Sequence, residues 1–357
     1  MKILFASDQA FLPQLTGGIE VSTAQLGAEL VRQGHEVAVL CRIGHRDIVW
    51  AESWLRRKLS GRAFPPTRLG CLQIFRGWDV VEGLEEVRQR WLPDAIIVQG
   101  SQPRSFELAS RAAGAGMRTW YYAHDVSFIE SGRQLPELGR VRWISNSKYT
   151  QRVLNSSLGV PSDIVPPCID AQIYRVNSSR EFVTMINPRL SKGGSTTLDI
   201  AEDCPDINFL LVEAWLSGQR EVQILKQRAM GMTNVTWWPT QPDMRQVYGR
   251  TRILIAPSKL HETWGRVVTE TQISGIPAIV SDMGALPETV GQGGVVLPAD
   301  AAREKWARAV RTLYDDATVY QSLADIAYGL GSSGETAPAN VVSQLMAALR
   351  NDEYAHL

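Results

Sequence analysis

The chain has 357 residues, about twice the length of a common domain, and the composition of an ordinary globular protein. Its formal net charge is zero, which argues against a nucleic-acid-binding protein, because such proteins usually carry a strong basic excess. No apolar run approaches the roughly 20 residues that cross a bilayer. The cysteines are too far apart in sequence to predict a zinc site or a redox pair. We therefore expect two domains, no metal site and a reducing, cytoplasmic environment.

The N-terminal half predicts alternating strands and helices. The chain enters a buried strand at residues 2–7 without a signal peptide. A Gly-containing loop, a helix between Ile19 and Gly34, and a second strand at 35–41 follow. Further strands are expected at 71–76, 95–100, 118–124 and 142–147. Units of this kind build parallel sheets, so residues 1–165 are expected to form a doubly wound α/β domain.

A basic segment interrupts this pattern at residues 42–76. It contains eight Lys and Arg residues against two acidic ones, together with Trp50, Trp54, Leu55 and Leu59. A basic, amphipathic, Trp-bearing stretch suits the surface of an anionic membrane or an anionic acceptor. The alternative is a solvated helix with ordinary core anchors. The sequence leaves both interpretations open.

The α/β pattern restarts in the second half. Residues 161–170 are rich in proline and predict a linker. Strands are then expected at 181–187, 208–214, 234–239, 252–258, 277–282 and 294–298. Helices fit between them, for example at 265–274, so residues 166–338 are expected to form a second α/β domain. Residues 339–357 predict a C-terminal helix, and two domains of similar size predict a cleft between them, where small-molecule sites often lie.

Ligands of open α/β sheets bind beyond the carboxyl ends of the strands, so we searched these positions for polar chemistry. Gly17 and Gly18 precede the first helix, where backbone N–H groups suit a phosphate. His124 follows the strand at 118–123. Arg189 and Lys192 stand in a Gly-ended loop that suits a diphosphate. Each feature also has an ordinary explanation, namely a turn, a packing histidine or a solvated loop.

The stretch HETWGRVVTE, residues 261–270, carries the most specific pattern. Glu262 and Glu270 are eight positions apart, with Gly265 between them. If a helix starts near Trp264, the two carboxylates lie roughly 10 Å apart. This spacing matches a ligand with hydroxyl groups at both ends and phosphates in the middle, which is the layout of a sugar nucleotide. The alternative is a helix whose carboxylates merely favour its N-terminal end.

Together these residues resemble the retaining glycosyltransferases of the GT-B fold, in the group 1 or GT4-like family, over nearly the full length. The motifs that carry the resemblance are LTGGIE (15–20), GHEVAVL (34–40), AHD (123–125), SNSKYT (145–150), VPPCID (165–170), the Lys192-Gly193 loop, HETWGRVVTE (261–270), SGIPAIVSDMGALPE (274–288) and GQGG (291–294). The resemblance implies two Rossmann-like domains facing each other across a cleft, with the last helix crossing back to the first. It also implies transfer of a sugar from a nucleoside diphosphate to an acceptor hydroxyl, with retained configuration and without a metal or other cofactor.

The resemblance further implies roles in the second domain. Glu262 contacts hydroxyls of the donor sugar, and Glu270 binds the ribose. Gly265 and Arg266 approach the sugar and the diphosphate. Lys192 pairs with the diphosphate and stabilises the charge that develops on the leaving nucleotide.

In the first domain, the resemblance implies that Gly17 and Gly18 close over the phosphate and that His124 contacts the sugar near the reacting centre. One departure concerns the arginine that the family usually has five positions before the lysine. Asn187 stands there in this chain, and Arg189 follows two residues later. Either residue is therefore a candidate for the arginine's role in the donor site.

Three functions remain in competition at this point. The first is a retaining glycosyltransferase, and the second is a non-catalytic sugar-nucleotide-binding protein of the same fold, which the displaced arginine favours. The third is a nicotinamide-dependent oxidoreductase, which lacks the G-x-G-x-x-G fingerprint here. The donor sugar, the base and the hydroxyl acceptor are not identified; base recognition is expected around Glu213 and 237–239. We expect a cytoplasmic protein, with contact at the inner face of the membrane through 42–76 as an open alternative.

Overall fold

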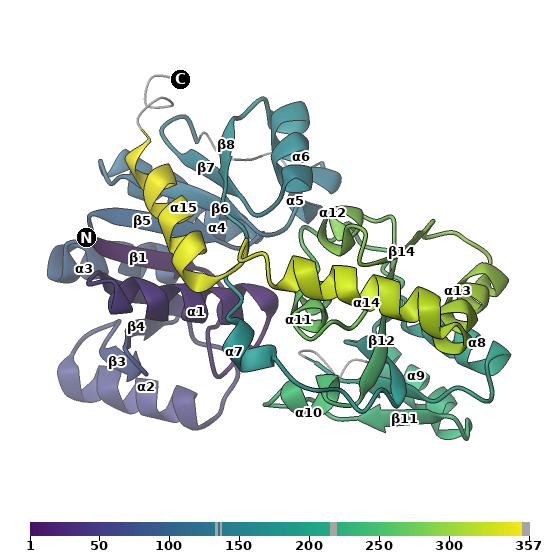
Figure 1. The fold of residues 1–357 in the computed structure, drawn as a ribbon. Helices are drawn as coiled ribbons and strands as arrows, with labels where there is room; N and C mark the ends of the chain where they lie inside the picture. Colours follow the sequence, from purple (N-terminus) through teal and green to yellow (C-terminus); the bar gives the residue numbers. More distant parts are fainter. Residues whose placement is uncertain (133–134, 136–137, 215–219, 352–357) are drawn as a thin grey trace. The chain divides into compact units, whose positions relative to one another are not determined.

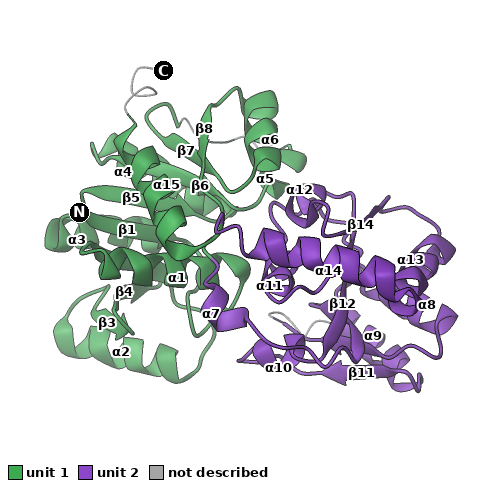
Figure 2. Cartoon of the chain, in the orientation of Figure 1, with its two compact units in different colours: residues 1–168, 336–357 green, residues 169–335 purple. Residues whose placement is uncertain are grey.

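The computed structural model describes residues 1–132, 135, 138–214 and 220–351. The chain divides into two compact units (Figures 1 and 2). Unit 1 comprises residues 1–168 and 336–357, and unit 2 comprises residues 169–335. The units therefore separate after Cys168, whereas the sequence placed the boundary after residue 165. The part of the expected C-terminal helix at 352–357 lies outside the described residues.

Unit 1 is built on a sheet that, within the described residues, has eight strands in the order β3-β4-β2-β1-β5-β6-β7-β8. Neighbouring strands are parallel except for the β3–β4 pair. The strands are β1 (Lys2–Ser7), β2 (Glu36–Arg42), β3 (Pro66–Leu69), β4 (Leu72–Gly77), β5 (Ala95–Gln99), β6 (Thr119–Ala123), β7 (Arg142–Ser145) and β8 (Ser162–Ile164). The carboxyl ends of the seven parallel strands therefore share one edge of the sheet.

Two apolar cores lie on the two faces of this sheet. Side chains of β1 alternate between them, since Leu4 joins one core and Phe5 joins the other. The Phe5 core includes Leu26 of the first helix and Leu345 of the last one. The helices of unit 1 are α1 (Gly18–Arg32), α2 (Ile48–Ser60), α3 (Val80–Trp91), α4 (Pro103–Gly114), α5 (Ser127–Glu130), α6 (Lys148–Leu158) and α15 (Pro338–Arg350). Helix α15 thus packs in the same core as α1 (Figure 1).

Unit 2 is built on a sheet of six strands within the described residues, in the order β11-β10-β9-β12-β13-β14, and every neighbouring pair is parallel. The strands are β9 (Phe182–Ile186), β10 (Phe209–Val212), β11 (Val235–Trp238), β12 (Thr251–Ala256), β13 (Ala278–Ser281) and β14 (Gly294–Leu297). The helices are α7 (Ala171–Tyr174), the 3-10 helix η1 (Leu190–Lys192), α8 (Gly194–Asp203), α9 (Arg220–Met230), α10 (Arg245–Tyr248), α11 (Arg266–Gln272), α12 (Leu286–Val290), α13 (Arg303–Asp315) and α14 (Ala317–Gly331). Val183 and Phe182 join different cores, so apolar layers cover both faces.

The predicted fold class, two doubly wound α/β domains, is confirmed. The linker prediction at 161–170 is wrong in its first part, because Ser162–Ile164 form β8 at the edge of the sheet. The register with β7 holds this short strand, and the N–H of Val165 donates to the carbonyl of Ser145 at 2.9 Å. Strand β3 was not expected, since Pro66–Leu69 lack a clear apolar alternation. Both edge strands, β3 and β8, therefore depend on hydrogen bonding to a neighbouring strand and not on a local sequence pattern.

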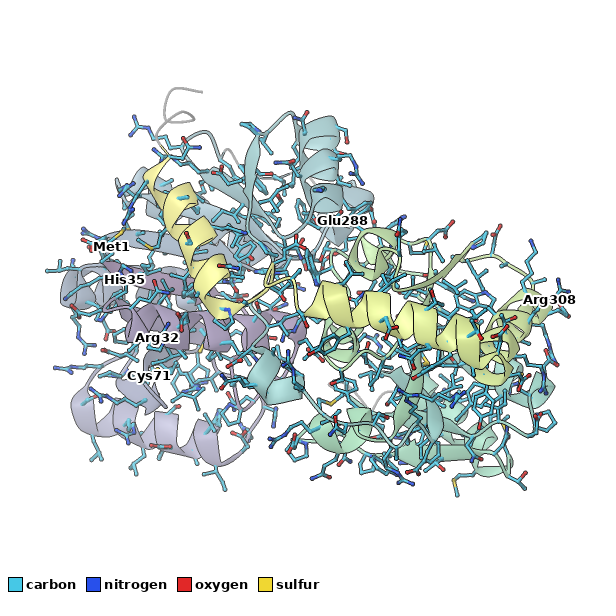
Figure 3. All side chains as sticks on the ribbon, viewed as in Figure 1. Met1, Arg32, His35, Cys71, Glu288 and Arg308 are labelled. Carbon is cyan, nitrogen blue, oxygen red and sulfur yellow. The ribbon has the colours of Figure 1, made fainter. Side chains whose placement is uncertain are left out.

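Two further features of the chain concern its covalent and membrane properties. All four cysteines are unbonded. Cys71, which is labelled in Figure 3, is exposed, and the other three are buried. In the part of the chain that the structure describes, no helix is long and apolar enough to cross a membrane. The fold is therefore held by its apolar cores and its hydrogen bonds, without a disulfide.

Candidate functional site

An ion pair joins two loops at the carboxyl ends of β9 and β12. Lys192 ends the helix η1 and donates from its ammonium group to the carboxylate of Glu262, which lies in the loop after β12. The hydroxyl of Ser258 donates to the same carboxylate oxygen at 3.1 Å. The side chains of Lys192 and Glu262 are 25% and 18% exposed. The structure therefore brings two predicted site residues together, with both charges partly open to solvent.

The lysine loop is fixed against the end of β12 by its backbone. Gly193 has φ +87°, and a Cβ atom there would collide with the carbonyl oxygen of Pro257. The N–H of Lys259 donates to the carbonyl of Ser191 at 2.9 Å. The left-handed conformation and the close approach both require glycine. The Lys192-Gly193 sequence thus sets the position from which the ammonium group reaches Glu262.

The loop after β13 holds the backbone of Glu262. The N–H of Ala285 donates to the Glu262 carbonyl at 2.6 Å. Gly284 has φ +66°, and a Cβ atom there would collide with the same carbonyl. The hydroxyl of Ser281 donates to the carbonyl of Ser258 at 2.7 Å. Residues of the SDMGALPE motif therefore hold the backbone of the loop that carries Glu262. This contact gives a structural reason for the presence of both the SDMGALPE and the HETWGRVVTE motifs in the chain.

Helix α11 follows Gly265, its N-cap residue, and begins at Arg266. The sequence had placed the helix start near Trp264 and the helix over 265–274; the structure shows a shorter helix that starts two residues later. The indole of Trp264 is buried, and its N–H donates to the hydroxyl of Thr269 at 3.0 Å. Trp264 thus ties the loop to the first turn of the helix. Gly265 adopts φ +85°, a left-handed conformation that a right-handed helix excludes, so α11 begins at Arg266.

Glu270 lies inside α11 and is buried, with 6% of its surface exposed. The hydroxyl of Tyr248 donates to one carboxylate oxygen at 2.6 Å, and Nε of Arg266 donates to the other at 3.2 Å. Arg266 also donates to the hydroxyl of Tyr174 at 3.1 Å. Burial, and then the Glu270 charge, raise the pKa of Tyr248 well above its ordinary value. The Tyr248 hydroxyl therefore remains a donor, and the carboxylate keeps lone pairs for a further hydroxyl.

The two candidates for the family's arginine position lie on the loop after β9. Nε of Arg189 donates to Glu221 at 3.0 Å. Asn187 adopts φ +60°, a left-handed conformation that asparagine tolerates. Its N–H donates to the carbonyl of Val212, and its carbonyl accepts from the N–H of Arg189, both at 2.8 Å. Asn187 shapes the turn, while Arg189 forms an ion pair with α9.

The region expected near the base contains a polar cluster at the ends of β10 and β11. The carboxylate of Glu213 accepts from Nζ of Lys226 at 2.9 Å and from the indole N–H of Trp237 at 2.7 Å. The backbone N–H of Glu213 donates to the carbonyl of Trp238 at 2.9 Å. This cluster fixes the end of the sheet next to the loop that carries Lys192.

The predicted residues Gly17, Gly18 and His124 belong to unit 1. Gly17 is the N-cap of α1, and its N–H donates to the carboxylate of Glu20 at 3.1 Å. Burial raises the pKa of Glu20 to about 7, although backbone donors oppose this shift. His124 follows β6, is partly buried, and has its ring centroid 3.8 Å from that of Tyr122. These residues lie at the strand ends of unit 1.

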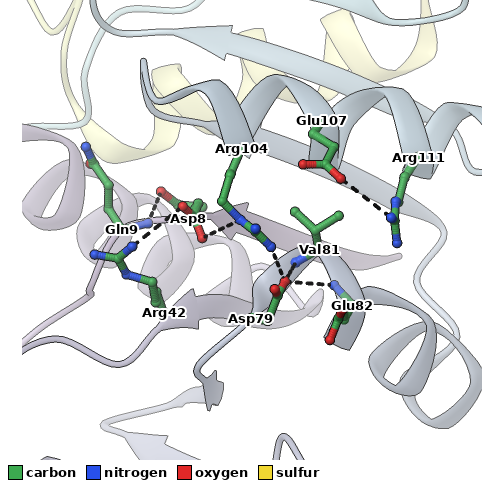
Figure 4. A network of polar contacts seen from close by, with 10 residues as sticks. Asp8, Gln9, Arg42, Asp79, Val81, Glu82, Arg104, Glu107 and Arg111 are labelled. Atoms are coloured by element: carbon green, nitrogen blue, oxygen red, sulfur yellow. Dashed lines mark hydrogen bonds and ion pairs between the residues drawn. The ribbon is translucent and has the colours of Figure 1, made fainter. Parts of the chain in front are cut away.

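A charged network in unit 1 was missed by the sequence analysis (Figure 4). Asp8 directly follows β1 and is 5% exposed; its carboxylate oxygens lie 3.8 Å from Arg42 and 3.8 Å from Arg104. Arg104 is also bonded to Asp79. Burial raises the pKa of Asp8, and the two arginines oppose this effect. Its position directly after a strand was the signal that the sequence offered.

The second unit therefore presents a cation suited to phosphate and two carboxylates suited to hydroxyl groups. Lys192 supplies the cation, and Glu262 and Glu270 supply the carboxylates. In the described ranges of the chain, no three histidine, cysteine or acidic side chains gather as a metal site would require. Phosphates and hydroxyl groups are the chemical groups that these side chains can bind.

Family models match both halves of the chain. Residues 16–173 match Glycosyltransferase Family 4, and residues 198–316 match Glycosyl transferases group 1. The chain belongs to the group 1, GT4-like glycosyltransferases. The predicted family is thus confirmed, and membership favours a glycosyltransferase over the oxidoreductase. No curated protein sequence matches this glycosyltransferase significantly.

Solved structures show the same GT-B fold. The Anabaena protein HepE in complex with UDP and glucose has a TM-score of 0.74 at 19% identity, with 98% of this chain and 99% of that chain covered. Sucrose-phosphate synthase from Thermosynechococcus elongatus has a TM-score of 0.77 at 14% identity, with 98% of each chain covered. A glycosyltransferase from Rickettsia africae has a TM-score of 0.72 at 13% identity, with 99% of this chain and 98% of that chain covered. At these identities the likeness establishes the fold.

Proposed function

We propose that this glycosyltransferase transfers a sugar from UDP-sugar to an acceptor hydroxyl, with retained anomeric configuration and without a metal ion. The observation that carries the proposal is the partly exposed pair of Lys192 and Glu262 at the ends of β9 and β12. A cation for phosphate and a carboxylate for sugar hydroxyls stand side by side there. UDP is the proposed nucleotide because the structurally similar HepE was solved with UDP and with UDP-glucose.

In the proposed reaction, the donor diphosphate displaces Glu262 from Lys192. The freed carboxylate accepts hydrogen bonds from hydroxyls of the donor sugar, while the ammonium group stabilises the charge that develops on the leaving diphosphate. The bond between the anomeric carbon and the phosphate oxygen breaks as the acceptor oxygen bonds to the same face of that carbon. The acceptor proton passes to the phosphate oxygen. This route retains the configuration without a protein nucleophile, and Lys192 supplies positive charge that a metal ion supplies elsewhere.

The nucleoside is proposed to lie along the rest of the unit 2 sheet edge. Glu270 accepts hydrogen bonds from the ribose hydroxyls, held in place by Tyr248 and Arg266. The uracil lies near the cluster of Glu213 and Trp237. Unit 1 contributes Gly17 and Gly18 to phosphate contact and His124 to sugar contact. The two remaining candidates at the arginine position, Asn187 and Arg189, belong to the loop before Lys192.

We propose a cytoplasmic location and an acceptor that is a glycan, a glycolipid or a small molecule with a free hydroxyl. The location is supported by the four unbonded cysteines, since disulfides are typical of oxidising compartments. The acceptor proposal is supported by the network around Asp8 in unit 1 (Figure 4), in which Arg42, Arg104 and Asp79 are partly exposed and offer charges of both signs to a polar molecule.

A donor screen tests the proposal. The purified protein is incubated with a panel of nucleotide sugars, and nucleotide release is measured with and without EDTA. We expect release from a UDP-sugar, unchanged by EDTA, and NMR of the product formed with a hydroxyl acceptor is expected to show the donor's anomeric configuration. Inversion would reject the retaining mechanism, and loss of activity in EDTA would reject metal independence. The Lys192→Ala variant is expected to lose most UDP affinity.

A non-catalytic sugar-nucleotide-binding protein is the second candidate. The ion pair of Arg189 with Glu221 favours this function. It holds the guanidinium of Arg189, a cation of the lysine loop, against α9 and away from Glu262. Isothermal titration calorimetry separates the two functions. Tight binding of a nucleotide sugar, together with no release across all donors and several hydroxyl acceptors, would establish the binding function.

A further inference from the structure

Helix α2 carries a surface that the proposed transfer reaction does not use. The helix begins after the N-cap Asp47, whose carboxylate accepts from the N–H of Trp50 at 2.8 Å and from the side chain of Gln14 at 2.8 Å. Ser53 is its buried residue. The guanidinium of Arg57 lies over the ring of Trp78, 4.9 Å from the centroid. These contacts define the face of α2 that is packed on unit 1.

The opposite face of α2 exposes three large apolar side chains together with Glu52. Ile48 is 86% exposed, Leu55 51% and Leu59 79%. At about 100° per residue, these three side chains fall within roughly 40° of one another and point away from Ser53. Single exposed apolar residues are ordinary on protein surfaces, whereas several large ones on one helix face, as in this apolar stripe, mark an interaction site. Trp54, 42% exposed, lies about 100° from Leu55 around the helix, beyond Lys58.

Cations flank the stripe on both sides. Arg56 and Lys58 are exposed and fall roughly 80° to either side of the stripe on the helix. Lys58 also lies over the ring of Trp54, 4.6 Å from the centroid. Across residues 46–62 there are five Lys and Arg residues against Asp47 and Glu52, and Glu52 is paired with Arg56 at 2.8 Å. The net charge next to the stripe is therefore positive.

A hollow of about 440 Å³ adjoins this face. It is lined by Arg56 of α2 and by Pro66, Thr67, Arg68 and Gln73 of the β3–β4 ribbon. Two guanidinium groups and a hydroxyl suit a phosphate. Arg56, which flanks the apolar stripe, thus also lines the hollow.

We propose that α2 docks unit 1 onto a bilayer rich in anionic phospholipids. The stripe of Ile48, Leu55 and Leu59 enters the boundary between headgroups and acyl chains, and the flanking cations meet lipid phosphates. An apolar face bordered by Lys, Arg and Trp is the pattern of helices that lie in a membrane interface. A phosphate headgroup fits the hollow between Arg56 and Arg68. The charge around the stripe selects an anionic surface over a neutral one.

Vesicle flotation tests the docking proposal. The full chain is mixed at low salt with vesicles of phosphatidylglycerol and phosphatidylcholine, or of phosphatidylcholine alone. We expect binding to the anionic vesicles, about tenfold weaker binding to the neutral ones, and weakening in high salt. Lack of binding to the anionic vesicles at low salt would overturn the proposal.

Matched variants locate the binding surface. The double variant Leu55→Gln with Leu59→Gln is expected to lose at least about tenfold in vesicle affinity. Its control is Ile224→Gln with Met230→Gln, which removes two exposed apolar side chains from α9 of unit 2. Wild-type vesicle affinity of the α2 variant, or an equal loss in the control, would overturn the proposal.

Variants of the charged residues and the oligomeric state of the protein in solution complete the test. Arg56→Gln with Lys58→Gln is expected to reduce anionic binding, while Lys305→Gln with Arg308→Gln on α13 leaves it unchanged. Equal effects of the two pairs would overturn the docking at α2. Light scattering measures whether the stripe instead joins two copies of the chain. A wild-type dimer that the double leucine variant converts to a monomer would also overturn the docking proposal. A retained thermal shift with UDP shows that each variant is folded, and the vesicle result does not depend on the proposed transfer reaction.

Discussion

At the scale of single residues, Lys192 and Glu262 form an ion pair at the centre of the proposed donor site. Each group neutralises the other while both stay partly exposed. A diphosphate carries more negative charge than one carboxylate, so it competes well for the ammonium group. In the proposed reaction, the same competition releases Glu262 to the sugar hydroxyls. The ion pair would thus couple phosphate binding to sugar recognition.

The variant Glu262→Gln separates these two steps. The amide keeps the shape of the side chain and removes its charge, so the hydrogen bonds that it accepts from the sugar hydroxyls are weakened. We expect turnover to fall by about 10²-fold. UDP affinity should stay equal or increase, because Lys192 no longer has a competing carboxylate. Steady-state kinetics and calorimetry with UDP measure the two quantities, and near-normal turnover would remove Glu262 from the reaction.

A second residue, Glu20 at the start of α1, predicts a pH dependence of stability. Burial raises its folded-state pKa to about 7 from the ordinary value of 4.5. Between these values the folded protein holds a proton that the unfolded chain has lost. The associated stability is therefore fully present below pH 4.5 and is lost as the pH rises to about 7. The full loss is on the order of 3 kcal/mol.

Urea unfolding from pH 5 to pH 8 measures this effect. The wild type is expected to lose stability relative to Glu20→Gln as the pH rises, because the amide accepts the Gly17 N–H bond without ionising. The exposed Glu304→Gln is the matched control, and its curve should run parallel to the wild type. Parallel curves for Glu20→Gln as well would show that the carboxyl is not held protonated.

At the scale of elements, the strands were predictable because buried parallel strands are short apolar runs between polar residues. The predictions at 95–100 and 277–282 correspond to β5 (Ala95–Gln99) and β13 (Ala278–Ser281). The strand β8 was hidden because its three residues stand between prolines and pair only through β7. The start of α11 was missed because Gly265 adopts a left-handed conformation at φ +85°, which the sequence pattern does not reveal.

The same limit applied to the candidate site. Lys192 and Glu262 were found because each lies in a loop directly after a strand. The partners of α11 left no local signal, since Tyr248 is 22 residues from Glu270 and Tyr174 is 92 residues from Arg266. Contacts over such distances depend on tertiary packing. Sequence patterns therefore locate the charged ends of the site, and the structure supplies the groups that orient them.

The helix α11 offers a test of that orientation. Tyr248→Phe removes the hydroxyl that donates to Glu270, so the carboxylate gains freedom and loses its fixed direction. We expect UDP affinity to fall about tenfold and the free energy of unfolding to fall by about 1–2 kcal/mol. Calorimetry and urea unfolding measure the two effects.

The matched control is Tyr320→Phe in the same unit. The hydroxyl of Tyr320 donates to the carbonyl of Arg252 at 3.1 Å, and the ring is also buried. This variant should lose a similar amount of stability and keep its UDP affinity. Equal losses of affinity in both variants would mean that Tyr248 acts only through stability.

At the scale of the whole molecule, the proposed roles divide between the two units. The nucleotide contacts belong to unit 2, through Lys192 and Glu270, whereas His124 and the Asp8 network belong to unit 1. Each unit has its own sheet and its own apolar cores. A substitution in one unit should therefore leave the binding chemistry of the other intact. Nucleotide affinity and turnover become separable quantities.

The variant His124→Ala tests this division. The proposed contact with the sugar near the reacting centre acts in the transition state, so its removal should lower turnover by about 10²-fold. UDP contacts only unit 2 residues in this scheme apart from Gly17 and Gly18, so its dissociation constant should change by less than about twofold. His35→Ala is the control, because His35 is also a partly buried histidine of unit 1 and lies by the amino terminus (Figure 3). Turnover of His124→Ala equal to that of the control would assign His124 to packing against Tyr122, and weakened UDP binding would add His124 to the proposed nucleotide contacts.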